Sequence, residues 1–169
     1  MDNKIGGYAI AQVARKLKEN NIKLPYTLHI VNSVQEEVGL RGAKMIASRL
    51  RPNAAIVTDV THDTSTPMIK PVEEGDVKCG SGPSLAFAPA IHYKLLDIVM
   101  EAAAENKIPY QRSAYNRATG TDTESFAYSH SGVPTVLLSM PLKYMHTTVE
   151  MCHKDDAVSY THLTLPTIA

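Results

Sequence analysis

The feature that most constrains the fold of this 169-residue chain is a repeated alternation of strand-like and helix-like segments. The strand-like segments are short and rich in β-branched residues, and the helix-like segments repeat apolar residues every three or four positions. The predicted strands are 26–33, 54–60, 110–115 and 133–140, with further short strands and turns within 67–87, and the predicted helices are 5–19, 40–50, 91–105 and 122–130. This alternation predicts an α/β fold with a mixed, mostly parallel sheet sandwiched by helices.

The composition is typical of a globular domain and excludes several classes of protein. Apolar residues make up 44% of the chain, and 17 basic side chains balance 17 acidic ones. This balance argues against nucleic acid or an anionic membrane surface as the main partner. No apolar run approaches the ~18 residues that a membrane helix needs. Two cysteines, Cys79 and Cys152, indicate no disulfide framework, so we expect a cytoplasmic protein with reduced thiols.

Polar residues follow the predicted strands, where ligands commonly bind in open α/β sheets. Glu36 and Glu37 follow the first strand, Asp59 ends the second, His146 follows the last, and Asp2 lies at a helix start. Carboxylates with imidazole suit Zn²⁺, Co²⁺ or Mn²⁺. A two-metal centre also needs a base that binds no metal. One of the adjacent glutamates can bind metal while the other serves as the base, because their side chains diverge in a tight loop.

Each of these residues also has an ordinary structural explanation. Asp2 can serve as a helix N-cap, and a pair of glutamates is usually a solvated surface. A lone histidine is more often structural than a ligand. Three other histidines are equally available in place of His146: His62, His130 and His153. The residues by themselves therefore do not decide whether the chain has a metal site or which histidine would belong to it.

Five motifs nevertheless occur together in a fixed order. They are Asp-Asn-Lys-Ile-Gly-Gly at 2–7, Gln-Glu-Glu-Val-Gly-Leu-Arg-Gly-Ala at 35–43, Asp59 at a strand end, Gly-Thr-Asp at 120–122 and Leu-Lys-Tyr-Met-His-Thr at 142–147. In this order they resemble the TET-type glutamyl aminopeptidases, a family of dinuclear metallo-aminopeptidases in which some members are labelled endoglucanase M. The resemblance covers about residues 1–156 and identifies them as the C-terminal portion of the catalytic domain.

The resemblance implies a role for each matching residue. Asp2 would bridge two divalent ions, Zn²⁺ or Co²⁺, with Glu37 and His146 as ligands of one and Asp59 as a ligand of the other. Glu36 would be the general base of an aminopeptidase that removes N-terminal residues from peptides through a metal-activated water. Weaker matches place four further residues in the substrate cleft: Gly82, Thr121, Asp122 and Lys143.

The sequence departs from the family pattern at its start, so we expect an incomplete catalytic domain. The family has a further metal-binding histidine in a His-x-Asp motif and a small β domain that serves assembly, both upstream of the segment that begins here. One metal would keep Asp2, Glu37 and His146, and the other only Asp2 and Asp59. We therefore expect weak or absent activity. The alternative is a truncated, non-catalytic fragment that binds at most one metal and lacks the domain through which the family forms homo-oligomers.

The sequence also departs from the family pattern at its end. Residues 157–169 show no apolar spacing of 3.6 residues and resemble a translated sequencing adapter. We therefore expect a non-native or disordered tail that follows a domain ending at residue 156.

Two further questions concern the substrate. Paired carboxylates can also hydrolyse glycosides, but the additional Asp2, Asp59 and His146 are better explained by metals. Three cations could favour an acidic first residue in a peptide, or could equally be surface residues: Arg112, Arg117 and Lys143. The sequence therefore leaves the preferred residue open.

Overall fold

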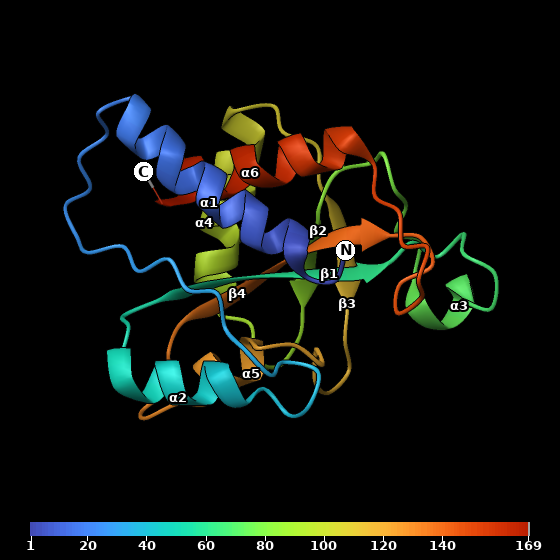
Figure 1. The fold of residues 1–169 in the computed structure, drawn as a ribbon, viewed down its shortest axis with the longest axis horizontal. Helices are drawn as coiled ribbons and strands as arrows, with labels where there is room; N and C mark the ends of the chain where they lie inside the picture. The colour runs from blue at the N-terminus through green and yellow to red at the C-terminus, as the bar shows by residue number, and fades with distance from the viewer. Residues whose placement is uncertain (169) are drawn as a thin grey trace.

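A single four-stranded sheet forms the centre of the structure, a computed structural model that describes residues 1–168 (Figure 1). Its strands are β1 (Ala55–His62), β2 (Ser84–Phe87), β3 (Gln111–Ala114) and β4 (Thr135–Leu142), in the order β1-β4-β2-β3. β1 pairs with β4 and β2 with β3 in parallel, whereas β2 and β4 are antiparallel. The sheet is therefore mixed and mostly parallel, which confirms the prediction.

Helices cover both faces of this sheet (Figure 1). One face carries α1 (Lys4–Glu19), α4 (Tyr93–Glu105) and α6 (Lys154–Ile168), and the other carries α2 (Arg41–Leu50) and α5 (Thr123–Ala127). The short α3 (Pro71–Glu74) lies beyond one end of the strands. Within residues 1–168, no helix is both long enough and apolar enough to cross a membrane.

The core lies between these layers and follows the predicted apolar patterns. All eight residues of β4 are buried, because the strand has neighbours on both edges and helices on both faces. α1 buries Ala9, Val13 and Leu17, and α4 buries Leu96 and Val99, at the spacing of one helix face.

Residues 26–33 do not form the strand that their sequence predicts. The neighbouring β1 lies at one edge of the sheet and pairs only with β4 within the described residues. Tyr26 and Ile30 are exposed, so these side chains of the segment are not packed against the sheet. Strand propensity depends on such packing, and this explains the wrong prediction.

The segment after residue 156, for which we expected a non-native or disordered tail, forms α6 as far as Ile168. Tyr160 and Leu163 of this helix are fully buried. Its threonines bond to backbone carbonyls four residues earlier, at 2.8–3.1 Å, which satisfies their hydroxyls inside the structure. The buried positions include Asp156, Tyr160 and Thr164, so polar side chains conceal the helical spacing. A foreign origin of the segment stays a prediction.

Two buried carboxylates hold the loop at residues 78–83. Asp156, in the first turn of α6, accepts hydrogen bonds from the backbone N–H groups of Gly80 (2.7 Å) and Gly82 (2.8 Å). Asp63 accepts hydrogen bonds from the backbone N–H groups of Cys79 (3.0 Å) and Ser65 (2.7 Å). The loop is therefore fixed from both sides by groups that lie far apart in the sequence.

Asp63 gives a pH dependence of stability that can be measured. Burial by itself raises the pKa of Asp63, but the hydrogen bonds from Ser65 and Cys79 outweigh it and hold the pKa below its ordinary value. The stabilisation is therefore complete above the unfolded pKa and disappears as the pH falls through the folded pKa. We expect Asp63→Asn to cost about 2 kcal/mol of unfolding free energy at pH 7 and progressively less below about pH 4.

Urea unfolding of the two proteins between pH 3 and pH 7 measures this difference. Asp97→Asn, on the exposed face of α4, is the matched control and should change stability by less than about 0.5 kcal/mol at every pH. A deficit of Asp63→Asn that stays constant down to pH 3 would contradict the explanation.

Candidate metal centre

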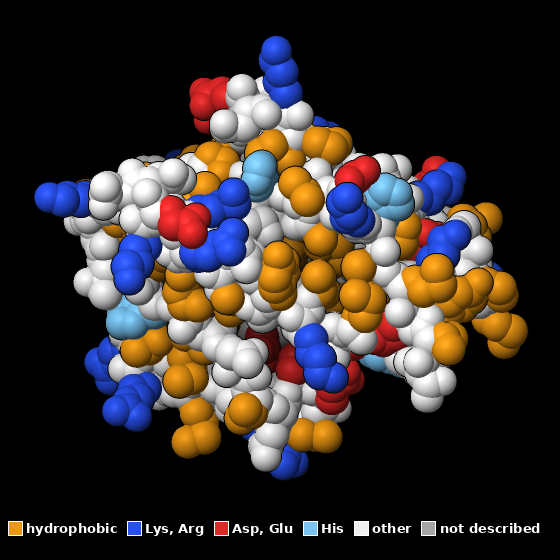
Figure 2. Space-filling view, turned by 45° about the horizontal axis from the view of Figure 1, so that its top comes forward, with side chains coloured by type: hydrophobic (Ala, Val, Ile, Leu, Met, Phe, Trp, Pro, Cys, Tyr) orange, Lys and Arg blue, Asp and Glu red, His pale blue; other side chains and the backbone are white. Residues whose placement is uncertain are grey.

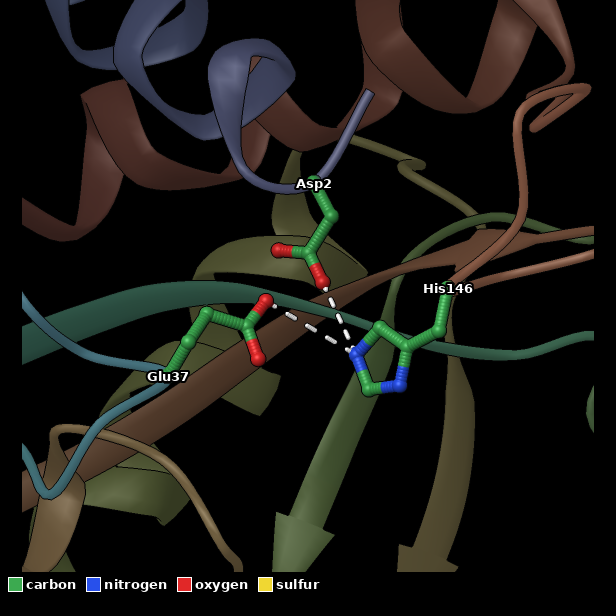
Figure 3. Close-up of side chains that lie close together, drawn as sticks. All are labelled: Asp2, Glu37 and His146. Atoms are coloured by element: carbon green, nitrogen blue, oxygen red, sulfur yellow. Dashed lines mark ion pairs between the residues drawn. The ribbon is translucent and has the colours of Figure 1, made fainter.

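Three of the predicted ligands meet at one end of the sheet (Figure 3). The Nε2 atom of His146 lies 3.1 Å from Oδ2 of Asp2 and 3.8 Å from Oε1 of Glu37. One ligand atom from each residue lies within 4.8 Å of the other two. Two carboxylate oxygens and one imidazole nitrogen at this separation form a donor set that suits Zn²⁺ or Co²⁺.

The backbone around Asp2 joins the start of α1 to the sheet. Asn3 is the N-cap of α1, and its side-chain oxygen accepts a hydrogen bond from the backbone N–H of Gly6 at 2.9 Å. The side-chain amide of Asn3 also donates to the carbonyl of Thr58 in β1, at 2.9 Å. Asp2 is therefore held above β1 by its neighbour in the sequence.

Glu37 and His146 lie in tight loops. The turn that carries Glu37 is closed by bonds from the backbone N–H groups of Gly39 (3.1 Å) and Leu40 (2.9 Å) to the carbonyl of Glu36. In the loop after β4, Tyr144 and His146 have left-handed φ angles of +57° and +63°. The backbone N–H of His146 donates to Glu150 at 2.8 Å. Left-handed backbone at non-glycine residues is frequent in functional sites.

Asp59 and Glu36 lie close to this group without belonging to it. Asp59 is buried in β1, and its Oδ1 accepts bonds from the backbone N–H of Val60 (2.8 Å) and the side-chain amide of Asn3 (3.3 Å). Glu36 and Asp59 line the same cavity as Asp2, Glu37 and His146. All five residues that the sequence predicted for the metal centre therefore line the same cavity.

The site gathers negative charge, and burial together with this charge raises the pKa values of its carboxyl groups. Burial, helped by the charges of Asp122 and Glu37, raises the pKa of Glu36 to about 7. Burial raises the pKa of Asp59 to about 7 as well. The raised pKa values reflect burial first and repulsion between neighbouring carboxylates second. A bound cation would relieve this repulsion, so the electrostatics of the chain's own residues fit a metal site.

The space beside the ligands is hollow. A cavity of about 250 Å³ lies between the metal-site residues, the end of β1 and the loops after β3. A second cavity of about 670 Å³ lies between α1 and residues 30–37 and shares Asp2, Glu36 and Asp59 with the first. In Figure 2 the surface of the molecule is hollowed, and acidic side chains lie at the floor of the hollow.

The four weaker cleft residues divide into two pairs. Thr121 lines the smaller cavity, and Asp122 lines the larger one and accepts a hydrogen bond from the Ser33 hydroxyl. Gly82 and Lys143 line neither cavity in the described part of the chain. A Cβ at Gly82 would lie only 2.2 Å from the carbonyl oxygen of Pro109, so this glycine is needed for close backbone packing. Lys143 pairs through its backbone with Met151.

His62 is a cavity residue that the sequence did not distinguish. It ends β1, and its ring centroid lies 6.3 Å from that of His146. Burial, together with His146, lowers the pKa of His62. Its Nδ1 atom is buried and has no hydrogen-bond partner within the described residues. The signal that could have identified it is its place at the carboxyl end of a strand that is parallel to its neighbour.

Comparison with known proteins now decides the family. The sequence matches the M42 glutamyl aminopeptidase family over residues 1–163. The chain belongs to this family. The match to the M42 family extends beyond residue 156 into α6. The similarity to the family therefore continues past the domain boundary that we expected at residue 156. The resemblance inferred from the motifs is confirmed.

Three relatives illustrate the likeness of this M42 chain. A lysyl aminopeptidase from Pyrococcus furiosus is 35% identical over 158 residues, which are 92% of this chain and 43% of the relative. A TET aminopeptidase from a marine sediment archaeon of the Thaumarchaeota has a TM-score of 0.90 at 30% identity, covering 99% of this chain and 47% of its own. The TET1 peptidase of Pyrococcus horikoshii, which assembles into a tetrahedron or a large octahedral shell, has a TM-score of 0.78 at 27% identity, with 99% and 48% covered.

The M42 chain thus spans about half the length of the relatives it matches. Its family consists of aminopeptidases, which are hydrolases, and it has the fold of TET peptidase catalytic domains.

Proposed function

We propose that this chain carries the metal-binding part of an aminopeptidase centre that removes N-terminal residues from peptides. The observation that supports this proposal best is the meeting of Asp2, Glu37 and His146 from three distant segments, beside the Glu36 carboxyl group. An ordinary ion pair needs only one carboxylate beside the imidazole, whereas two carboxylates and one imidazole that face one point form a donor set that suits a divalent cation.

The residues divide the chemistry between them. Asp2, Glu37 and His146 would hold one divalent ion, and Asp2 with Asp59 would contribute to a second. Such ions, when bound, polarise a peptide carbonyl and lower the pKa of water toward ~7. Glu36, with a pKa of about 7, can accept a proton from water near neutral pH and return it to the leaving amine. The cavity beside these groups offers room for the first residue of a peptide.

Glu36→Gln tests the role of the general base. We expect any metal-dependent hydrolysis of leucine and glutamate chromogenic amides by the chain to fall roughly 10²–10⁴-fold. Glutamine keeps the size of the side chain but cannot carry the proton, so Zn²⁺ affinity measured by calorimetry should stay within about threefold. Glu73→Gln, an exposed carboxylate paired with Lys70, is the control. Unchanged turnover in Glu36→Gln would remove this residue from the mechanism.

A second candidate function is a non-catalytic form that binds at most one metal. The observation in its favour is that Asp59 lies outside the group of three ligands and already accepts two hydrogen bonds through Oδ1. Calorimetric titration with Zn²⁺ and Co²⁺ separates the two candidates. Two tight sites with turnover support the aminopeptidase, and a single site without turnover supports the non-catalytic form.

Assembly and location are inferred on separate grounds. A related TET1 peptidase forms large shells, so we infer that the whole protein forms homo-oligomers, which light scattering can measure. Both cysteines are free, which is consistent with a reducing, cytoplasmic compartment.

A further inference from the structure

The strand β3 forms an open edge of the sheet, and this edge leads into the metal-site cavity. In the described part of the chain, β3 pairs only with β2. The backbone N–H groups of Gln111 and Tyr115 donate to backbone carbonyls in and just before β2, each at 2.8 Å. Because backbone groups alternate in direction along a strand, those of Arg112 and Ala114 point away from β2. Ala114 also lines the cavity that contains the proposed metal ligands.

The outward backbone groups of β3 are available to a ligand. Arg112 and Ala114 are both exposed, and within residues 1–168 no bond reaches their backbone from outside the pair of β2 and β3. An extended peptide can bond to such an edge as an additional strand. A peptide whose first residue lies in the cavity would pass Ala114 and then Arg112, so it would run antiparallel to β3.

The side chain of Arg112 is held beside this edge by two aromatic rings. Its guanidinium carbon lies 5.7 Å from the ring centroid of Phe87 and 5.9 Å from that of Tyr110. Its Nη2 atom also donates to the Tyr110 hydroxyl at 3.4 Å. Within residues 1–168 this guanidinium makes no ion pair. A guanidinium stacked in this way keeps further N–H donors for a carboxylate.

Building on the aminopeptidase function proposed above, we propose that the β3 edge binds the downstream part of the peptide substrate as an antiparallel strand, and that Arg112 binds an acidic side chain on that part. With the first residue of the peptide opposite Ala114 or Tyr115, its third or fourth residue lies opposite Arg112. Side chains directly opposite each other share one face of the sheet, with Cβ atoms roughly 4.5–5.5 Å apart, so a glutamate there reaches the guanidinium.

Binding of tetrapeptide amides tests this selectivity without any need for turnover. A leucyl peptide with three glutamines, and three copies of it with one glutamate at the second, third or fourth position, are titrated into Zn²⁺-saturated Glu36→Gln. This variant of the 169-residue chain suppresses hydrolysis. We expect glutamate at the third or the fourth position, but not at both, to strengthen binding roughly fivefold. Glutamate at the second position should stay within about twofold of the reference, because it lies too close to the cavity to face Arg112.

Two matched variants locate the preference. Arg112→Gln should bring the preferred peptide within about twofold of the all-glutamine reference. Arg117→Gln removes an exposed arginine that follows the same strand, and it should keep the preference for glutamate.

N-methylated peptides test the pairing itself. Because Arg112 presents both its N–H and its C=O to the peptide, the residue opposite exchanges two hydrogen bonds with it, whereas the residue before points its N–H away. N-methylation of the preferred glutamate should therefore weaken binding about fivefold, and N-methylation of the preceding residue should change it by less than about twofold.

Four results would overturn the inference: glutamate acts equally at every position, Arg112→Gln keeps the preference, both N-methylated peptides bind alike, or no peptide binds. A Zn²⁺ titration of the same samples separates this inference from the proposed function. Zinc binding without a positional preference rejects the inference alone, whereas absence of zinc binding rejects the proposed function as well.

Discussion

Replacing His146 by asparagine should weaken the binding of the first Zn²⁺ by at least roughly 100-fold. Loss of residues that merely orient a metal ligand already costs 10–100-fold, and His146 supplies the only nitrogen of the group of three. Asparagine is suitable here because it tolerates the left-handed backbone at φ +63°. Its shorter side chain cannot place an atom where Nε2 lies, 3.1 Å from Asp2.

The matched control is the same substitution at His162, an exposed residue of α6. His162→Asn should leave Zn²⁺ affinity within about twofold of the wild type, and both variants should unfold with midpoints close to it. Competition with a chelator of known affinity measures the two dissociation constants. Equal zinc affinity in His146→Asn and the wild type would show that Asp2, Glu37 and His146 do not form the metal site.

Leu163→Ala should destabilise the fold by about 2–5 kcal/mol. Leu163 is fully buried in α6, which packs on α1, α4 and β4. Truncation to alanine removes apolar contacts and leaves a cavity between these elements. The same helix supplies Tyr160, whose hydroxyl donates to the backbone carbonyls of Asp59 (3.3 Å) and Leu138 (3.1 Å). Loosening α6 should therefore also disturb the strand that carries Asp59.

Val158→Ala provides the comparison on the same helix, because Val158 is 49% exposed. It should change stability by no more than about 0.5 kcal/mol. Urea unfolding followed by far-UV circular dichroism measures both variants. Equal midpoints for Leu163→Ala and the wild type would mean that residues 157–168 contribute nothing to the core and would support the view of a foreign tail.

Long apolar patterns determined most of the fold in advance. The helices α1, α2 and α4 and the strands β1 and β4 lie within a few residues of their predicted ranges, because each buries one regular face or a continuous apolar run. The structure differs most from the sequence pattern in two segments, where pattern and environment disagree. Residues 26–33 have strand-forming side chains but form no strand, although β1 has an open edge. The α6 helix has buried threonines and Pro166, which no apolar period reveals.

For the site, the sequence by itself determined the family and supplied the candidate ligands of the proposed metal centre. The Glu36–Glu37 pair, the Asp59 strand and the His146 loop form an ordered set of motifs that occurs within the M42 family. Only the tertiary structure decided which of these residues meet. It joined Asp2, Glu37 and His146 within 4.8 Å, placed Gly82 and Lys143 elsewhere, and brought His62 and Glu74 into the cavity. The physical reason is that local sequence sets backbone conformation, whereas the distances between side chains depend on how β1, β4 and the helices pack.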